Sequence, residues 1–377
     1  MRVGVIGGGQ LARMLALSAA PLGVRVLAYD PALDACTEAV APVEHGDFDD
    51  LPALHAFAEQ CDFITFDFEN VSAPALTELS ATKPVRPNAR ALATTQDRAL
   101  EKALFLELGI AVAEFVEVGD LADSRFRTGT LAYPAILKTR RLGYDGKGQT
   151  RVDTADAVHA AFSELGEVPC VLETRVQFSR ELSLIAVRGT DGELLCYPLV
   201  ENVHVDGILS TSLAPARVTP ELEQQACECA TRLADALDYT GVFAVEFFQL
   251  DGHLLANEVA PRVHNSGHWT IEGAETSQFE NHIRAVTGLP LGSTAPRGVS
   301  CMLNWIGEMP DVKAALRVPG LHWHDYGKEP RLRRKVGHAT ITAKDFDELA
   351  QRLELAGQVL GREWQVAPAL AAMRKPV

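Results

Sequence analysis

The first hundred residues alternate between short apolar runs typical of strands and longer apolar runs with helical spacing. Met1–Gly9 predicts a strand followed by a glycine turn, and an alanine- and leucine-rich helix is expected from about Gln10 to Ala20. Further strands are predicted at Val24–Tyr29 and Asp62–Phe68. Strands that alternate with helices are typical of an α/β sheet, so we expect a Rossmann-like domain here.

Prolines and an asparagine at positions 84–88 mark a boundary, after which strand-like runs become frequent. Helices are expected among them at Thr95–Leu108, Ala155–Leu165 and Pro220–Leu237. From Val299 the pattern predicts a small, mainly β unit with a closing helix near Phe346–Leu355.

Two apolar runs in the second half of the chain contain polar residues that strands rarely bury. The runs, Val242–Leu250 and His253–Ala260, are joined by Asp251-Gly252, which predicts a hairpin turn. Their polar residues are Glu246, Asn257 and Glu258. Burial of such groups is costly unless they meet a cation, and an all-oxygen set of few ligands suits Mg²⁺. A partly exposed hairpin with scattered carboxylates is the alternative.

The register of this hairpin tests the metal hypothesis. A two-residue turn would pair Val245 with Glu258 and would direct Glu246 and Glu258 to opposite faces of the sheet. One added residue brings them to the same face, as in a three-residue loop with Gly252 in the left-handed conformation. A shared metal therefore predicts a bulged turn.

A glycine-rich segment follows the predicted strand Ala135–Thr139, which carries Lys138 near its end. The segment 140–149, RRLGYDGKGQ, combines three glycines with basic residues and a tyrosine. This composition suits a flexible loop that closes over phosphates. The segment is not a Walker A loop, because no Ser or Thr follows Gly146-Lys147. An ordinary glycine-rich hairpin is the alternative.

Composition and charge narrow the class of protein. The chain has 377 residues and a formal charge of −15, which argues against a general nucleic-acid binder. No apolar run approaches the length that spans a membrane, and Met1 opens directly into a strand without a leader pattern. Seven cysteines without a C-x-x-C pair predict reduced thiols. We expect a cytoplasmic protein that binds neither nucleic acid nor membranes.

The glycine turn after the first strand opens a competing hypothesis. Gly7, Gly9 and Ala12 match a dinucleotide fingerprint, and Asp30 stands where a ribose ligand is expected. This pattern is typical of NAD(P)-binding oxidoreductases. Gln10 at the helix start and the lack of nicotinamide-side chemistry weigh against it, although the turn still offers backbone N–H groups to an anion.

Polar clusters near the end of the chain have two interpretations each. His264 and His268 have the i,i+4 spacing of a zinc helix, but Asn265-Ser266-Gly267 is poor helix sequence and zinc is disfavoured. The basic run from Lys328 to Lys335 is either a solvated face or a phosphate-binding patch.

Taken together, these motifs resemble the ATP-grasp superfamily. GGGQLARM, GYDGKGQ, HVDGILSTS, NEVAPRVHNSGHWT and RRKVGH are similar to the N5-carboxyaminoimidazole ribonucleotide synthase family within it. The resemblance runs from Met1 to about Ile341. It implies an α/β and α+β ATP-grasp fold with a Rossmann-like preATP-grasp domain at 1–95. An ATP-grasp domain at 96–290, with a lid at about 115–188, and a mainly β C-terminal domain at 291–377 are implied too.

The resemblance implies ATP- and bicarbonate-dependent carboxylation of 5-aminoimidazole ribonucleotide in purine biosynthesis, through carboxyphosphate. ATP and Mg²⁺ are the implied cofactors, and a homodimer is expected. The implied metal ligands are Glu246 and Glu258. The implied ATP-binding residues are Arg98, Lys138, Gly143, Tyr144, Gly146, Gly148, Gln149, Glu173, Val176, Glu181, His204 and Asn257.

The resemblance also implies the residues around the ribonucleotide and bicarbonate. The substrate-binding residues are Gln10, Glu69, Tyr144, Asp145, Asn265, Lys328 and Arg334. The catalytic residues are Asp145, Lys147, Arg262 and His264. Asp145 is either a base for the substrate amine or a group that orients it, and the sequence leaves both roles open.

Three other functions compete with this interpretation. A formate-dependent glycinamide ribonucleotide transformylase shares the fold and the acyl-phosphate strategy. An NAD(P)-binding oxidoreductase would use Gly7–Ala12 but gives no role to Glu246, Glu258 or Lys138. A catalytically silent ATP-sensing subunit would bind nucleotide without turnover.

Overall fold

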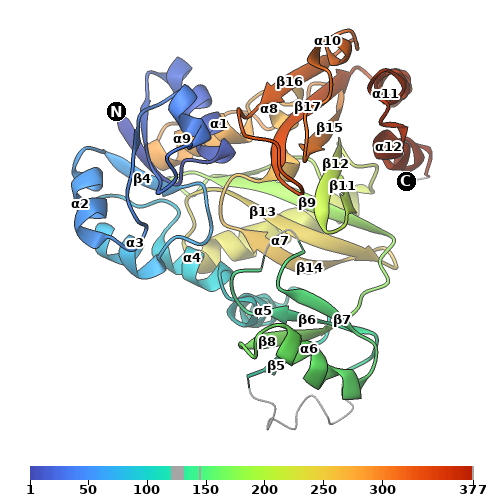
Figure 1. The fold of residues 1–377 in the computed structure, drawn as a ribbon, viewed down its shortest axis with the longest axis horizontal. Coiled ribbons are helices and arrows are strands. Elements are labelled where there is room, and N and C mark those ends of the chain that lie inside the picture. The colour runs from blue at the N-terminus through green and yellow to red at the C-terminus, as the bar shows by residue number, and fades with distance from the viewer. Residues whose placement is uncertain (120–130, 144–145, 376–377) are drawn as a thin grey trace.

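Three β-sheets organise the chain (Figure 1). The computed structural model describes residues 1–119, 131–143 and 146–375. The N-terminal sheet lies at one end of the large central sheet, and the third sheet lies below it (Figure 1).

The N-terminal sheet is parallel and has the strand order β3-β2-β1-β4. Its strands are β1 (Arg2–Ile6), β2 (Arg25–Tyr29), β3 (Val43–Glu44) and β4 (Phe63–Phe66). Its helices are α1 (Gln10–Ala19), α2 (Leu51–Glu59), α3 (Ala73–Leu79) and α4 (Ala89–Thr95). Val3 and Val5 of β1 are fully buried, as expected for a strand covered on both faces. The predicted Rossmann-like domain is confirmed.

The smallest structural unit is a lid with the strand order β5-β8-β6-β7. Its elements are β5 (Phe115–Val118), β6 (Ala135–Thr139), β7 (Gln149–Val152), α6 (Val158–Glu164) and β8 (Cys170–Thr174). The lid sheet ends at Thr174. The next strand, β9 (Arg180–Arg188), pairs with β11 and β13 of the large sheet, although the sequence prediction placed it in the lid.

The large sheet has nine strands in the order β14-β13-β9-β11-β12-β15-β17-β16, with β10 paired to β9. Its remaining strands are β10 (Leu194–Cys196), β11 (Val200–Val205), β12 (Ile208–Ala214), β13 (Gly241–Leu250), β14 (His253–Ala260), β15 (Val299–Ile306), β16 (Leu321–Asp325) and β17 (Lys335–Ala343). The C-terminal strands therefore extend the sheet that carries the Glu246 hairpin.

Helices cover this sheet and connect it to the other units (Figure 1). They are α5 (Arg98–Glu107), α7 (Pro220–Leu237), α8 (Thr270–Gly273), α9 (Gln278–Thr287), α10 (Val312–Ala315), α11 (Phe346–Leu360) and α12 (Glu363–Arg374). Helix α9 contacts both β13 and α1, so it ties the large sheet to the N-terminal domain. Helix α5 begins at Arg98 because Asp97 caps it, with Oδ1 accepting the Ala99 N–H at 3.0 Å.

The turn of the β13–β14 hairpin differs from the prediction. Leu250 pairs with His253, so Asp251 and Gly252 form a two-residue turn, with φ values of 50° and 80°. Both values suit the Asp-Gly preference of tight hairpin turns. The extra residue lies instead inside β14, where Glu246 pairs with Glu258 and Phe247 pairs with Ala256. The predicted bulge exists, but it is at Asn257 and not in the turn.

The cysteines also differ in part from the prediction of reduced thiols. Cys196 of β10 and Cys227 of α7 form a disulfide, whereas Cys36, Cys61, Cys170, Cys229 and Cys301 are free and buried. Sequence could not indicate this pair, because the two residues are brought together only by packing of α7 on the large sheet.

Candidate active site

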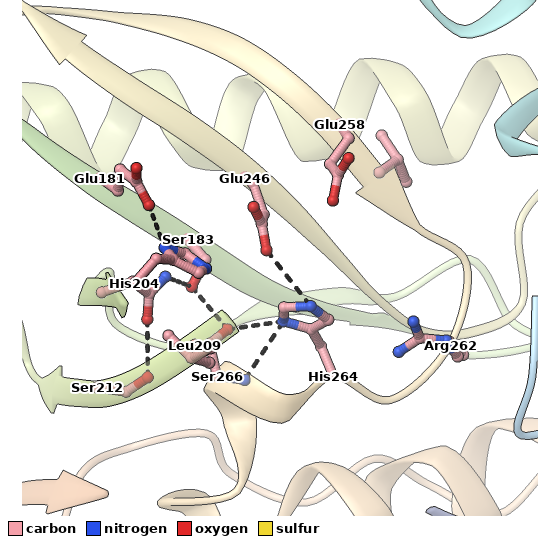
Figure 2. A network of polar contacts seen from close by, with 12 residues as sticks. Glu181, Ser183, His204, Leu209, Ser212, Glu246, Glu258, Arg262, His264 and Ser266 are labelled. Carbon is pink, nitrogen blue, oxygen red and sulfur yellow. Dashed lines mark hydrogen bonds and ion pairs between the residues drawn. The ribbon is translucent and has the colours of Figure 1, made fainter. Parts of the chain in front are cut away.

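Glu246 and Glu258 face each other across the β13–β14 ladder. The bulge at Asn257 places them as direct cross-strand partners, and Figure 2 shows both carboxylates on the same side of the sheet. The Asn257 Oδ1 atom is buried and accepts no hydrogen bond from any described residue. The hairpin therefore carries two facing carboxylates and, at the bulge next to Glu258, a buried amide oxygen without a partner among the described residues.

The electrostatics of this pair favour a bound cation. Burial and the neighbouring charge of Glu258 raise the pKa of Glu246. Burial also opposes the ionisation of Glu258, but Arg98 and Lys138 outweigh it and lower the pKa of Glu258. Arg98 Nη1 lies 3.0 Å from Glu258 Oε2. A dication between the carboxylates would remove their mutual repulsion.

The residues present fit Mg²⁺. Among the residues that the structure describes, no group of three or more His, Cys, Asp or Glu side chains could hold a metal ion. A site with two carboxylates and an amide oxygen suits Mg²⁺, because this ion takes few protein ligands and completes its shell with phosphate oxygens and water.

A cluster of cations lies beside the acidic pair. Lys138 Nζ donates to Glu173 Oε2 at 2.9 Å, and Lys102 Nζ lies 3.3 Å from the same oxygen. Lys102, Lys138 and Glu173 are all buried. Burial opposes the ionisation of Glu173, but Lys138 and Lys102 outweigh it and lower its pKa. With Arg98, the cluster carries more positive than negative charge and is suited to phosphates.

The glycine-rich segment begins next to these cations. A Cβ on Gly143 would lie 3.8 Å from Arg98 Nη2, which brings the start of the segment to the cluster. Gly146 and Gly148 have φ values of 77° and 69°, which favour glycine. Gln149 pairs with Lys138 in the β6–β7 ladder. Two predicted residues of the segment, Tyr144 and Asp145, lie outside the described residues, whereas Lys147 lies within them.

The remaining predicted nucleotide-binding residues lie on β8, β9 and β11 and in the segment between β8 and β9. Glu173 ends β8 within the cation cluster, and Val176 is half-buried in the segment that leads to β9. Glu181 Oε2 and His204 Nδ1 form an ion pair between β9 and β11 (Figure 2). Burial lowers the pKa of His204, but the hydrogen bond to Glu181 outweighs it and the net pKa is raised.

The predicted substrate residues bring three parts of the chain together. Arg262 Nη2 lies 3.0 Å from Glu69 Oε1, which joins the end of β14 to the N-terminal domain. Lys328 Nζ donates to Gln10 Oε1 at the start of α1. The C-terminal basic run therefore reaches the N-terminal domain through at least one of its members.

Two further predicted residues are placed differently. Asn265 is buried, and neither its side-chain nitrogen nor its oxygen has a hydrogen-bond partner among the described residues. Such an amide is costly to bury unless a ligand satisfies it. Arg334 Nη1 donates to the Glu329 carbonyl at 3.2 Å, within its own loop.

His264 lies between Glu246 and Ser266. Its Nε2 atom is 3.4 Å from Glu246 Oε1, and Nδ1 is 2.8 Å from Ser266 Oγ. Burial, with a smaller contribution from Arg262, lowers the pKa of His264 well below its usual value. His264 is therefore a neutral imidazole in contact with the acidic pair (Figure 2).

The glycine turn of the N-terminal domain is already satisfied by the protein's own carboxylates. Asp67 Oδ2 accepts the N–H groups of Gly9 and Ala12, both at 3.0 Å, and Asp30 Oδ2 accepts the Gly8 N–H at 2.6 Å. A Cβ on Gly7 would lie 1.7 Å from Asp67 Oδ1. Asp67 therefore lies directly against the turn. The prediction that the turn offers its N–H groups to an external anion is wrong for Gly8, Gly9 and Ala12, whose N–H groups are paired within the protein.

Sequence reasoning assigned no function to three buried charged residues. Lys102 and Glu101 follow Arg98 on α5, and Glu101 Oε1 accepts the Val259 N–H at 2.6 Å next to Glu258. The i,i+4 spacing of Arg98 and Lys102 was the available signal for Lys102. Asp67, two residues before Glu69, offered no signal, because a carboxylate at a strand end is equally typical of a loop.

Comparison with known protein families covers most of the chain. The ribonucleotide synthetase preATP-grasp domain matches residues 1–96, and the ATP-grasp domain matches residues 103–279. The phosphoribosylaminoimidazole carboxylase C-terminal domain matches residues 300–352. With the cation cluster and the acidic hairpin, these matches define an ATP-grasp enzyme, an ATP-dependent ligase.

Individual relatives identify the family within this class. N5-carboxyaminoimidazole ribonucleotide synthase of Pseudomonas aeruginosa is 50% identical over 94% of this chain and 98% of its own length. The synthase of Bacillus subtilis is 41% identical over 93% of this chain and 94% of its own. The chain belongs to the N5-carboxyaminoimidazole ribonucleotide synthase family, whose members use ATP to carboxylate 5-aminoimidazole ribonucleotide in purine biosynthesis.

Solved structures agree with this assignment. The synthetase from Thermus thermophilus has a TM-score of 0.91 at 48% identity and covers 95% of this chain and 98% of its own. The Aspergillus clavatus synthase in complex with ADP and 5-aminoimidazole ribonucleotide has a TM-score of 0.88 at 35% identity, covering 96% of this chain and 98% of its own. No described helix of this chain is long and apolar enough to span a membrane.

Proposed function

We propose that the chain makes N5-carboxyaminoimidazole ribonucleotide from ATP, bicarbonate and 5-aminoimidazole ribonucleotide through carboxyphosphate, with Mg²⁺ held by Glu246 and Glu258. One observation carries this proposal. Arg98 lies 3.0 Å from Glu258, so the buried cation cluster and the acidic pair meet at a single point. Phosphoryl transfer needs this combination of charge neutralisation and alignment more than covalent help from the protein.

The ATP phosphates bind between the cation cluster and the acidic pair. Lys138 and Arg98 contact the phosphate oxygens, and Asn257 Oδ1 lies beside the metal ligands. When bound, Mg²⁺ neutralises phosphate charge and aligns the γ-phosphate. The β8–β9 segment, Glu173 to Val176, holds the adenine, and Glu181 with His204 lies on the ribose side.

The first chemical step is attack of a bicarbonate oxygen on the γ-phosphorus. The bond from the γ-phosphorus to the bridging oxygen breaks, ADP leaves with the electron pair and carboxyphosphate forms. Arg262 is suited to this anion because its guanidinium is charged and buried beside Glu69. His264 contacts Glu246 and lies on the same side of the sheet.

The second step transfers the carboxyl group to the exocyclic amine of 5-aminoimidazole ribonucleotide. The amine forms a bond to the carboxyl carbon, phosphate leaves and the amine loses a proton. By the family motif, Asp145, Tyr144 and Lys147 of the glycine-rich segment act on this substrate, with Asp145 as base or positioner. Gln10, Glu69, Asn265, Lys328 and Arg334 bind the ribonucleotide. A closed segment protects carboxyphosphate from water.

We assign ATP binding to the domain at residues 96–290. Ribonucleotide binding is shared by this domain with the domains at residues 1–95 and 291–377. The contact between Lys328 and Gln10 supports it, because it joins the first and last of these domains at one place. We further propose a cytoplasmic homodimer, which sedimentation of the purified chain would test.

Isotope transfer tests the proposed route. The enzyme is given ATP, Mg²⁺, 5-aminoimidazole ribonucleotide and ¹⁸O-labelled bicarbonate, and the phosphate released is analysed by mass spectrometry. Attack of bicarbonate on the γ-phosphorus places one bicarbonate oxygen in that phosphate. Phosphate without label would contradict the carboxyphosphate route.

A second panel separates the nearest alternative. ATP cleavage is compared with 5-aminoimidazole ribonucleotide plus bicarbonate and with glycinamide ribonucleotide plus formate. We expect stimulation only by the first pair, and stimulation by the second pair alone would indicate a transformylase.

A further inference from the structure

Buried hydrogen bonds cross the large sheet and end on His264 (Figure 2). Ser212 Oγ donates to Asn202 Oδ1, and Asn202 Nδ2 donates to Ser183 Oγ, both at 2.8 Å. Ser183 Oγ lies 2.7 Å from Ser266 Oγ, which lies 2.8 Å from His264 Nδ1. The serines and Asn202 are buried, so water does not compete for these bonds.

The sheet register places these residues on the same face as the acidic pair. Glu246 is the cross-strand partner of both Glu258 and Ser183, and Asn202 is the cross-strand partner of Ser212. Between β9 and β11 the row steps by two residues, because Ser183 pairs with Val200. Five neighbouring strands thus carry one polar row on the side that faces the site. The strands fix the positions of Ser183, Asn202 and Ser212 in this row, and Ser266 reaches it from the segment Asn265–Gly267 that follows β14.

The hydrogen bonds of this row can all be donated toward His264 or all be donated away from it. Each serine hydroxyl both donates and accepts, and the amide of Asn202 can be turned over. If one hydrogen bond reverses, all of them reverse. The direction of these hydrogen bonds therefore depends on the groups at the end of the row. It also determines whether His264 Nδ1 carries a proton.

Two groups at that end select the same direction. The Ser266 backbone N–H donates to His264 Nδ1 at 3.3 Å, and a backbone N–H cannot accept. Nδ1 must therefore carry a lone pair. A neutral imidazole with a lone pair on Nδ1 carries its proton on Nε2. On that side of the ring, Glu246 Oε1 lies 3.4 Å from Nε2 and is placed to accept from it.

We propose that Ser183, Asn202, Ser212 and Ser266 are positioning residues that hold His264 as the tautomer protonated on Nε2. His264 then enters the reaction as a hydrogen-bond donor beside Glu246 and does not accept a proton through Nδ1. That the donor serves a reacting anion rests on the proposed function. The tautomer itself rests on the contacts of the row and on the hydrogen bond from the Ser266 backbone N–H to His264 Nδ1.

The tautomer is measured directly by NMR. The full chain is labelled with [¹⁵N]histidine, and two-bond ¹⁵N–¹H correlations report which ring nitrogen carries the proton. His264→Gln assigns the signal. We expect a protonated Nε2 and an unprotonated Nδ1 in the unliganded enzyme. A proton on Nδ1 would overturn the proposal.

Asn202→Asp tests whether the row controls the tautomer. An aspartate has the same shape but accepts from both Ser183 and Ser212, so Ser183 can no longer donate to Ser266. Ser266 Oγ then becomes an acceptor that faces His264 Nδ1. We expect the proton population on Nδ1 to rise and kcat to fall by about a hundredfold, with the KM for ATP changed by less than about threefold.

A matched serine pair controls for packing. Ser212→Ala removes a donor of the row, whereas Ser210→Ala removes a buried hydroxyl on the same strand that has no hydrogen-bond partner among the described residues. We expect only the first to change the ¹⁵N pattern and kcat. If Asn202→Asp does not fold, Ser183→Ala replaces it, because it interrupts the row without adding charge.

The outcomes separate this inference from the proposed function. Variants of the row that keep the wild-type ¹⁵N pattern and kcat would overturn the control of His264 by the row. An enzyme that has the predicted tautomer but ignores 5-aminoimidazole ribonucleotide would overturn the proposed function and leave the tautomer intact.

Discussion

The glycine turn of the N-terminal domain and the β13–β14 hairpin both contain carboxylates, but they differ in whether their polar groups are paired within the protein. In the N-terminal domain, Asp67 and Asp30 accept the backbone N–H groups of the glycine turn at 2.6 to 3.0 Å. In the β13–β14 hairpin, Glu246 and Glu258 face each other, and Asn257 Oδ1 has no partner among the described residues. The first place is satisfied internally, and the second is not.

The difference shows how a structural motif can be separated from a functional one. A buried polar group without a partner is costly, so its presence in a folded protein indicates a ligand or a catalytic function. A group that is already paired contributes to stability and leaves nothing for a ligand. Substitutions at the hairpin should therefore change activity, whereas substitutions at the glycine turn should change stability.

Glu258→Gln should have the largest effect. The change removes one of two carboxylates that face the metal and leaves Arg98 without its charged partner. We expect ATP cleavage stimulated by 5-aminoimidazole ribonucleotide to fall by about a thousandfold, because electrostatic stabilisation is the main contribution of the protein to phosphoryl transfer. Phosphate release assays measure it, with the exposed Glu193→Gln as control. Near-normal turnover would show that the acidic pair is not the metal site.

Lys138→Met should mainly weaken ATP binding. Glu173 keeps Lys102 at 3.3 Å as a partner, so the variant should fold. Loss of a charge-assisted contact to phosphate should raise the dissociation constant for ATP by about a hundredfold. Calorimetric titration with ATP and Mg²⁺ measures it, and the exposed Lys344→Met tests for the loss of one positive charge elsewhere. Equal affinity in wild type and Lys138→Met would exclude Lys138 from the phosphate site.

The sequence predicted the fold and the acidic pair well, because both depend on local patterns. Alternating apolar runs indicated the Rossmann-like domain, and two carboxylates in apolar strands indicated a cation. The position of the bulge was not predictable, since Asn257 and Gly252 were equally able to supply the extra residue. The pairing of the glycine turn was not predictable either, because Asp67 reaches it from the end of the neighbouring strand β4, far away in the sequence.

Gly7→Ala tests whether the glycine turn contributes to the stability of the protein. Gly7 has φ of 110°, and a Cβ there would lie 1.7 Å from Asp67 Oδ1. We expect a loss of about 3 kcal/mol or more in the free energy of unfolding, measured by urea denaturation. Gly252→Ala is the matched variant, because Gly252 has φ of 80° but nothing within 4 Å of a Cβ. It should lose only about 1 kcal/mol. Equal losses would show that Asp67 does not fill the turn.

Asp67→Asn should have the smallest effect, and its sign depends on pH. Burial raises the pKa of Asp67 to about 6 in the folded protein, above its unfolded value of 3.8. A carboxyl group with a raised pKa contributes most to stability below the unfolded pKa, and this contribution is lost as pH rises through the folded pKa. Wild type should therefore lose stability between about pH 5 and about pH 7.5 relative to Asp67→Asn, by about 1 to 2 kcal/mol. Urea denaturation of both proteins at the two pH values measures the difference. A constant difference would mean that Asp67 keeps an ordinary pKa, and the glycine turn would then stabilise its carboxylate as fully as water does.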